Sequence, residues 1–223
     1  MTARTTGAHE GAGVGDQKYF HDFYAERTWR DYRWLLSLVV KLSLPGPILD
    51  LGAGPGFFLE AASAWGLPCE GLDGSRYAID VALRRAPHLP LRYHLFHEPL
   101  PYQQASFQTI VCNEVIEHLG LSTAAFLLLE ARRVLKGGGK LLIFSPNAYN
   151  RREALGDPTH LHCFKPSEMQ RLLLRSGFRS VSPLNSGRPL LGSSLIAAKL
   201  GSLAFQLTGL DRLSASSNFV AEV

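Results

Sequence analysis

The run ILDLGAGPGFFLE, residues 48–60, constrains the fold more than any other part of the chain. An apolar stretch with Asp50 near its end leads into Gly52, Gly54 and Gly56, and an apolar pattern then resumes. Glycines lack Cβ atoms, so they allow a sharp turn and a close approach of a ligand to the backbone. We therefore expect a buried strand, a tight turn and a helix, with Asp50 able to accept hydrogen bonds from a ligand ammonium or a water. A tight turn without any ligand would need the same glycines.

The rest of the chain alternates short β-rich runs with helical patterns, which predicts a doubly wound α/β sheet. We expect a Rossmann-like, mostly parallel sheet of seven strands with helices on both faces. The expected strands are residues 46–51, 68–73, 91–96, 107–113, 140–147, 178–184 and 217–223. The expected helices are residues 16–42 (one or two), 56–66, 75–86, 114–119, 122–136 and 165–177. In such sheets a ligand binds beyond the carboxyl ends of the strands.

The length of 223 residues, 46% of them hydrophobic, is enough for one sizeable core, so we expect a single domain. Its expected parts are a disordered leader (1–16), N-terminal cap helices (17–44), a cofactor-binding core (45–188), an apolar helical insertion (189–212) and a last strand (213–223). Residues 189–210 are long enough to span a bilayer, but Lys199 and several serines favour an amphipathic helix. We expect that helix to pack on the domain, to contact a dimer partner or to form a lid, and a peripheral membrane contact is the alternative.

Cysteine content and net charge limit which cellular compartment and which partners we expect. The three cysteines are far apart in apolar surroundings and form no CxxC motif, and the first residues lack the apolar core of a signal peptide. We therefore expect reduced thiols and a cytoplasmic protein, either a monomer or a homodimer. The net charge of +4 permits a nucleic-acid partner but does not require one.

A second acid follows about twenty residues after the glycines, where doubly wound folds place a carboxylate on ribose hydroxyls. This is Asp73, at the end of the second expected strand. The two oxygens of a carboxylate suit a cis-diol. The alternative is that Asp73 serves only as a cap beside Ser75, which we expect to start the next helix.

With these features in place, the chain resembles the class I S-adenosylmethionine-dependent methyltransferases. Five stretches resemble motifs of that family in order: ILDLGAGPGFFL, EGLDGS, LPYQQASFQTIVCNEVIEHL, ARRVLKGGGKLLIFSPN and THLHCFKPSEMQRLLLRSGF. The resemblance implies an enzyme with S-adenosylmethionine as cofactor. It departs from the family at Gln108, where an Asp is usual, and at Phe96 and His97, where an acid that contacts adenine is often found.

The resemblance also implies which residues bind the cofactor. The implied set is Asp50, Gly52, Gly54 and Gly56 at the methionyl end, Asp73 at the ribose, Phe96 packed against the adenine, and Asn113. Of the histidines elsewhere, we expect His9, His21, His88, His94 and His97 to lie on the surface or in loops.

The run EVIEHL carries a second group of polar side chains. On a helix, positions i, i+3 and i+4 share a face, so Glu114, Glu117 and His118 would point the same way. Two carboxylates and an imidazole suit Mg²⁺, Mn²⁺ or Zn²⁺. His160 and His162 would share one side of an extended segment further along, where one of them could complete the coordination.

Two metal-using branches of the family are similar here, the ubiquinone-pathway O-methyltransferases and the small-RNA 3′-terminal 2′-O-methyltransferases. This resemblance implies Glu114, Glu117, His118 and His162 as metal ligands. Many other family members have the same run without a metal. In that case His118, His160 or His162 is the expected general base.

Three functions remain open from the sequence. The first is methylation of an oxygen on a small-molecule acceptor, with the aromatic N-terminal segment as a cap over the pocket or as ordinary packing. The second is a metal-dependent RNA 3′-terminal 2′-O-methyltransferase, against which stand the short chain and the scattered arginine pairs. The third is a cofactor-binding protein without catalysis.

Overall fold

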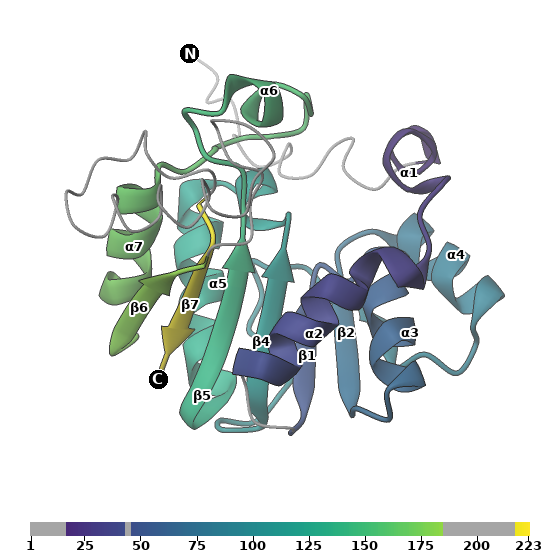
Figure 1. Cartoon of the computed structure of the whole chain (residues 1–223), viewed down its shortest axis with the longest axis horizontal. Coiled ribbons are helices and arrows are strands. Elements are labelled where there is room, and N and C mark those ends of the chain that lie inside the picture. Colours follow the sequence, from purple (N-terminus) through teal and green to yellow (C-terminus); the bar gives the residue numbers. More distant parts are fainter. Residues whose placement is uncertain (1–16, 43–45, 185–216) are drawn as a thin grey trace, which may run out of the picture.

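A computed structural model of the chain describes residues 17–42, 46–184 and 217–223. Its centre is a sheet of seven strands in the order β3-β2-β1-β4-β5-β7-β6 (Figure 1). All neighbouring strands from β3 to β5 pair in parallel, and only β7 runs antiparallel to its neighbours. The expected mostly parallel, doubly wound sheet is confirmed.

The strands are β1 (Ile48–Leu51), β2 (Cys69–Asp73), β3 (Leu91–Tyr93), β4 (Phe107–Asn113), β5 (Leu135–Phe144), β6 (Ser180–Pro183) and β7 (Phe219–Glu222). The α-helices are α1 (Gln17–Tyr24), α2 (Arg33–Leu42), α3 (Phe57–Ala64), α4 (Arg76–Arg85), α5 (Leu121–Val134), α6 (Arg151–Ala154) and α7 (Pro166–Arg175). Two short 3₁₀ helices are η1 (Trp29–Tyr32) and η2 (Ile116–His118).

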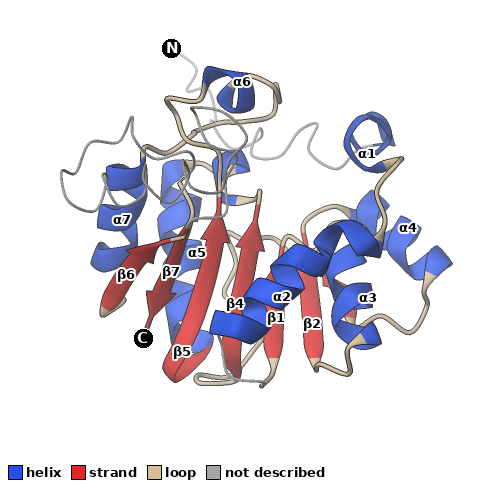
Figure 2. Cartoon of the chain, viewed as in Figure 1, coloured by secondary structure: helices blue, strands red, loops and turns tan. Residues whose placement is uncertain are grey.

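Helices cover both faces of the sheet (Figure 2). On one face, α2 and α3 pack against β1, β4 and β5 through a cluster that includes Leu36, Phe58 and Phe144. On the other face, α5 and α7 bury residues such as Leu127 and Met169 against the same strands. Strands β1 and β4 are buried along most of their length because both of their faces are covered.

Several helix ends form as the local sequence predicts. The Ser75 hydroxyl accepts a hydrogen bond from the Ala78 amide at 3.1 Å and caps α4. Pro166 occupies the first turn of α7, and Gly177 follows the end of that helix with a φ of +88°.

The structure corrects three expected elements. The strand expected over 91–96 ends at Tyr93, because the chain leaves the sheet as a loop that reaches α5. The strand expected to begin at residue 140 begins at Leu135 instead. The glycines at 137–139 therefore lie within β5, beside a register shift in the pairing of β4 with β5. Helix α6 has no counterpart among the expected elements.

Two predicted segments, the leader over 1–16 and the helical insertion over 189–212, lie outside the described residues. Within the residues that are described, no helix is both long enough and apolar enough to cross a bilayer.

Close packing of β2 against the glycine turn is tested by Gly71→Ala. A Cβ at Gly71 would lie 2.8 Å from the Ala53 Cβ and 2.9 Å from a methyl group of Leu59. We expect a loss of about 1–3 kcal/mol in the free energy of unfolding, measured by urea denaturation. Gly137→Ala is the matched control because its Cβ would meet nothing within 4 Å. Equal losses in the two variants would contradict this packing account.

Candidate functional site

A cavity opens at the carboxyl edge of β1, β2 and β4, where the sequence analysis placed the ligand. Helix α1 lies beyond this edge of the sheet (Figure 1). Residues from α1, the glycine turn, the loop after β3 and the region of η2 surround the cavity. They are Tyr19, Phe20, Tyr24, Gly52, Gly54, Asp73, Gly74, Ser75, Ala78, Leu95, Phe96, His97, Glu114, Val115, His118, Leu119 and Thr123.

The glycine turn and Asp73 form one side of this cavity as a single hydrogen-bonded unit. The Asp73 carboxylate accepts the Gly54 amide through Oδ2 and the Ser75 amide through Oδ1, each at 2.7 Å. Gly52 has a φ of +75°, and a Cβ there would lie 2.1 Å from the Val115 Cγ2. Only glycine fits that position, so the turn presents bare backbone to the cavity beside the carboxylate.

Asp50 lies in β1 behind the turn rather than among the residues that line the cavity. It is buried, and burial together with the nearby Asp73 charge raises its pKa to about 8. Burial also raises the pKa of Asp73, although the two amide hydrogen bonds oppose that shift. Two acids therefore lie close together under the turn, and burial favours their neutral forms when no cation is bound.

The other predicted cofactor residues divide between the cavity and the interior. Phe96 lines the cavity and is buried, and the adjacent His97 lines it as well. Gly56 begins α3 with a φ of +76° and is not among the lining residues, and neither is Asn113 at the end of β4. His94, which was expected at the surface or in a loop, lies in the loop after β3, where it is buried and its Nε2 lies 3.3 Å from the Glu98 carbonyl oxygen.

The second polar group does not form on a helix face as predicted. Glu114 precedes η2 with a φ of +56°, and η2 itself is a single 3₁₀ turn. Glu114 is exposed toward the cavity, whereas Glu117 is fully buried. The two carboxylates remain close enough that burial, first, and Glu114, second, raise the pKa of Glu117.

Glu117 meets His118 and His160 rather than His162. The potential ligand atoms of these three residues all lie within 4.8 Å of one another, and the two imidazole rings are 4.9 Å apart. The Glu117 oxygens make no hydrogen bond of normal geometry to any residue in the described ranges. His162 instead packs edge-on against the Phe164 ring, with a centroid distance of 4.5 Å. The structure thus selects one of the two histidines that the sequence left open.

A hydrogen-bonded chain through Thr159 and Asp157 holds His118. The Thr159 hydroxyl donates to Asp157 Oδ1 at 2.5 Å, so its oxygen is able to accept from His118 Nδ1 at 3.1 Å. The Thr159 carbonyl oxygen lies 3.3 Å from the same nitrogen. These contacts place the proton on Nδ1 and leave the lone pair on Nε2. Burial, followed by the neighbouring His160, lowers the pKa of His118.

Sequence analysis gave no role to Asp157, Thr159 or Arg27. The DPTH run that contains the first two resembles an Asx turn, and an Asx turn alone carries no functional signal. Backbone bonds from the Leu161 and His162 amides to the Glu117 carbonyl oxygen bring this segment to η2.

The aromatic N-terminal segment divides between its two predicted roles, because α1 contributes to the cavity wall whereas Trp29 and Tyr32 pack against a core cluster. Tyr19, Phe20 and Tyr24 of α1 line the cavity, and Tyr19 lies edge-on to His118 with a centroid distance of 6.2 Å. Burial and a hydrogen bond to Asp157 raise the pKa of Tyr19. Arg27, just beyond α1, contacts the Tyr24 ring at 5.4 Å and interacts electrostatically with Glu114.

Comparison with known proteins places this geometry in context. A family model described as a methyltransferase domain matches residues 21–182. An uncharacterized methyltransferase of Bacillus subtilis is 29% identical over 138 residues, which is 56% of this chain and 54% of that protein. A ubiquinone biosynthesis O-methyltransferase of Xanthomonas oryzae is 29% identical over 112 residues, 48% of this chain and 46% of that protein. The chain thus spans about half the length of the curated relatives it matches.

Solved structures share the fold. A SAM-dependent methyltransferase from Archaeoglobus fulgidus superimposes with a TM-score of 0.67 at 19% identity. The match covers 92% of this chain and 98% of the other.

Burial of Asp50 predicts a pH dependence of stability. The pKa of Asp50 rises from 3.8 to about 8 on folding, so the folded chain retains a proton that the unfolded chain releases. The contribution of Asp50 to the free energy of unfolding therefore decreases as the pH rises from 3.8 to about 8. We expect Asp50→Asn to stabilise the ligand-free protein by roughly 2–4 kcal/mol near pH 7 and to flatten this dependence, measured by urea denaturation across that range. The exposed Asp80 of α4 supplies the control Asp80→Asn. An unchanged pH profile in Asp50→Asn would show that Asp50 is ionised in the folded protein.

Proposed function

The chain belongs to the methyltransferase-domain family, among the class I S-adenosylmethionine-dependent methyltransferases, and we propose that it methylates an oxygen of a small-molecule acceptor. One observation carries this proposal: the side-chain-free turn and the Asp73 carboxylate open into the same cavity as His118. The ubiquinone biosynthesis O-methyltransferase among the relatives supports oxygen as the acceptor atom.

The cavity fits a sulfonium nucleoside on the evidence of its own atoms. A Cβ at Gly54 would lie in van der Waals contact with the Tyr24 hydroxyl, 3.7 Å away, so glycine leaves the backbone of the turn bare where it faces Tyr24. Each Asp73 oxygen already accepts one amide, and a carboxylate oxygen has capacity for a second donor such as a ribose hydroxyl. When bound, S-adenosylmethionine supplies the activated methyl group.

His118 is the proposed general base in the absence of a metal. With the Nδ1 proton held by Thr159, Nε2 is the atom that can accept a proton from an acceptor hydroxyl. Tyr19 and Phe20 would exclude water and align the acceptor, and alignment by itself supplies a large part of the rate enhancement in a displacement reaction. We propose His160 as a neighbour that supports this group, while His162 packs away from it.

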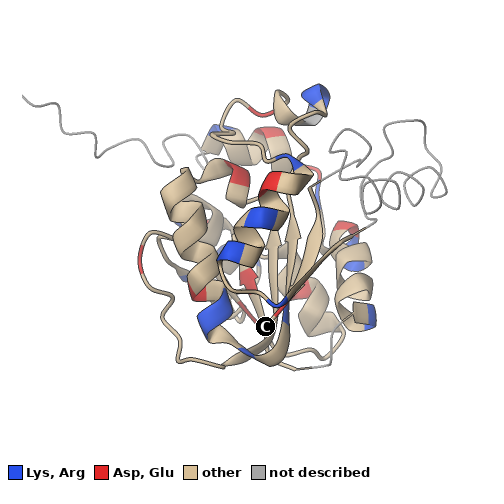
Figure 3. Ribbon diagram, turned by 90° about the vertical axis from the view of Figure 1, so that its left-hand side faces the viewer, with Lys and Arg blue, Asp and Glu red and all other residues tan. Residues whose placement is uncertain are grey.

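The electrostatics of the cavity favour a small acceptor over RNA. Asp73 and Glu114 line the cavity, and no Lys or Arg is among its lining residues. A phosphate backbone would therefore meet acids rather than the cations on which nucleic-acid binding depends. Lys and Arg are also interspersed with Asp and Glu along the described helices (Figure 3). Binding of a small RNA duplex with a steep salt dependence would revive the RNA alternative.

A divalent cation is a second candidate, favoured by the buried cluster of Glu117, His118 and His160. A buried carboxylate whose oxygens make no hydrogen bond of normal geometry among the described residues, and which lies beside the acid Glu114, is costly unless a cation or a proton compensates it. With Nδ1 of His118 held by Thr159, Nε2 is the available ligand atom. A cation bound there would lower the pKa of an acceptor hydroxyl. Compared with the set that the family resemblance implied, this ligand set has His160 in place of His162 and lacks Glu114.

Replacement of Asp73, the acid proposed to bind the ribose, tests the cofactor site. We expect Asp73→Asn to weaken binding of S-adenosylhomocysteine by roughly tenfold to a hundredfold in isothermal titration, because a charged acceptor for two hydroxyls is lost. Asp80→Asn on the exposed face of α4 is the control and should bind as the unaltered protein does.

Thermal unfolding of each variant separates a lost ligand contact from a lost fold. Equal affinity in Asp73→Asn and in the control would show that the ribose lies elsewhere. Turnover is then followed with labelled S-adenosylmethionine and a panel of phenols and alcohols. Tight cofactor binding with no transfer to any acceptor would instead favour a protein that binds the cofactor without catalysis.

The metal alternative makes a different prediction. If a cation binds, Mn²⁺ or Zn²⁺ should raise the thermal midpoint of the unaltered protein, and His160→Ala should abolish that rise. His162→Ala should preserve it, because His162 packs on Phe164 outside the cluster. Absence of any metal-dependent shift in the unaltered protein would remove the cation from the proposal.

A further inference from the structure

The loop between β3 and β4, residues 94–106, carries part of the cavity wall and is fastened to α5 at a distance from it. Its first half supplies Leu95, Phe96 and His97 to the cavity. The His94 amide donates to the Asp73 carbonyl oxygen at 2.9 Å, so this half begins at the proposed ribose site. Without further anchors, such a loop could place its cavity residues in many ways.

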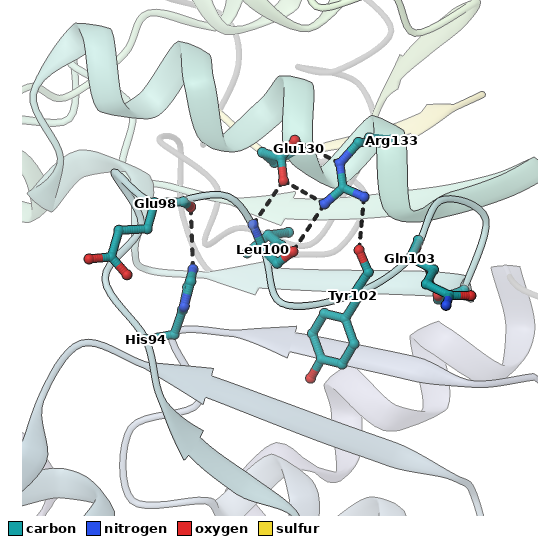
Figure 4. A network of polar contacts seen from close by, with 8 residues as sticks. His94, Glu98, Leu100, Tyr102, Gln103, Glu130 and Arg133 are labelled. Atoms are coloured by element: carbon teal, nitrogen blue, oxygen red, sulfur yellow. Dashed lines mark hydrogen bonds and ion pairs between the residues drawn. The ribbon is translucent and has the colours of Figure 1, made fainter.

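The second half of the loop is held by two side chains one helical turn apart on α5 (Figure 4). Glu130 Oε2 accepts the Leu100 amide at 2.8 Å. Arg133 donates to the carbonyl oxygens of Leu100 at 3.0 Å and Tyr102 at 2.8 Å. The two side chains also pair with each other at 2.6 Å.

This arrangement satisfies three backbone groups of the loop with one ion pair. The Glu130 side chain is 12% exposed and the Arg133 side chain is 34% exposed, so the pair is shielded from water more than an ordinary surface pair. Leu100, whose amide and carbonyl groups are both anchored, has its side chain buried in the same core cluster as Phe96. A shift of the anchored backbone would therefore reach Phe96 through both the chain and the packing.

We propose that Glu130 and Arg133 are positioning residues for the cofactor, and that they hold the loop so that Phe96 and His97 wall the nucleobase end of the cavity. This inference rests on the proposed function. Neither side chain is among the residues that line the cavity, so both act through the loop. The expected consequence is a loss of cofactor affinity without a loss of the catalytic step once the cofactor is bound.

The test measures binding of S-adenosylhomocysteine by isothermal titration to the full chain. Arg133→Met should raise the dissociation constant about tenfold, because three loop groups lose or weaken their charged partners. Arg132→Met is the matched control: the neighbouring arginine donates to the Gly177 carbonyl oxygen near α7 and does not contact the loop. Its dissociation constant should stay within about twofold of the unaltered value.

A double-mutant cycle with Phe96→Ala identifies the route. If Arg133 acts through the nucleobase wall, Arg133→Met should change the affinity by less than about twofold once Phe96 is already absent. A pair of Glu130 variants covers the possibility that Arg133→Met folds poorly. Glu130→Gln retains an oxygen for the Leu100 amide and should bind within about threefold of the unaltered protein, whereas Glu130→Ala should resemble Arg133→Met.

The outcomes separate this inference from the proposed function. Loss of binding in Arg133→Met and Glu130→Ala, with coupling to Phe96 and an unchanged kcat at saturating cofactor, supports the positioning role. Unchanged affinity in both variants, even with a lower thermal midpoint, would show that the pair is only structural. Full additivity with Phe96→Ala would also overturn the proposed route. Failure of the unaltered protein to bind S-adenosylhomocysteine would overturn the proposed function and this inference together.

Discussion

The carboxylate of Asp73 is the interaction on which the rest of the site depends. One oxygen holds the Gly54 amide of the turn after β1, and the other holds the Ser75 amide at the start of α4. Two turns from adjacent strands are thereby fixed to one side chain at the edge of the sheet. Because this side chain also lines the cavity, the group that shapes the turns is the group proposed to bind the ribose. Structural and binding roles are combined in Asp73, so the capping role weighed against ribose binding in the sequence analysis is real as well.

The electrostatics of the cavity depend on acids that are buried at or behind it without matching cations. Burial raises the pKa values of Asp50, Asp73 and Glu117, and no Lys or Arg lines the cavity. A ligand that carries a sulfonium and an ammonium group would favour the charged forms of these acids, whereas a phosphate-rich ligand would not. The proposed cofactor and the proposed preference for a small acceptor over RNA therefore rest on one electrostatic property.

Long-range contacts complete the site from segments that the chain order does not bring together. Tyr19 comes from α1 and His160 from the segment after α6, and both contact His118 at the end of η2. The sequence spacing identified the residue types, but the helical face predicted for them was wrong. The chain forms a single 3₁₀ turn there, and Glu114 adopts a positive φ. The choice of His160 over His162 depends on backbone hydrogen bonds to the Glu117 carbonyl oxygen, which no local pattern encodes.

The sequence by itself determined the alternation of strands and helices, the glycine turn, the acid after β2 and the cap at Ser75, since each depends on hydrophobic period or on backbone chemistry within a few residues. Tertiary structure alone decided which charged groups are buried together, which histidine joins Glu117, and how the pair on α5 holds the loop after β3. Those features arise from pairings across tens of residues, whose distances are set only when the sheet and its helices pack. A local pattern records which side chains are available, and packing decides which of them meet.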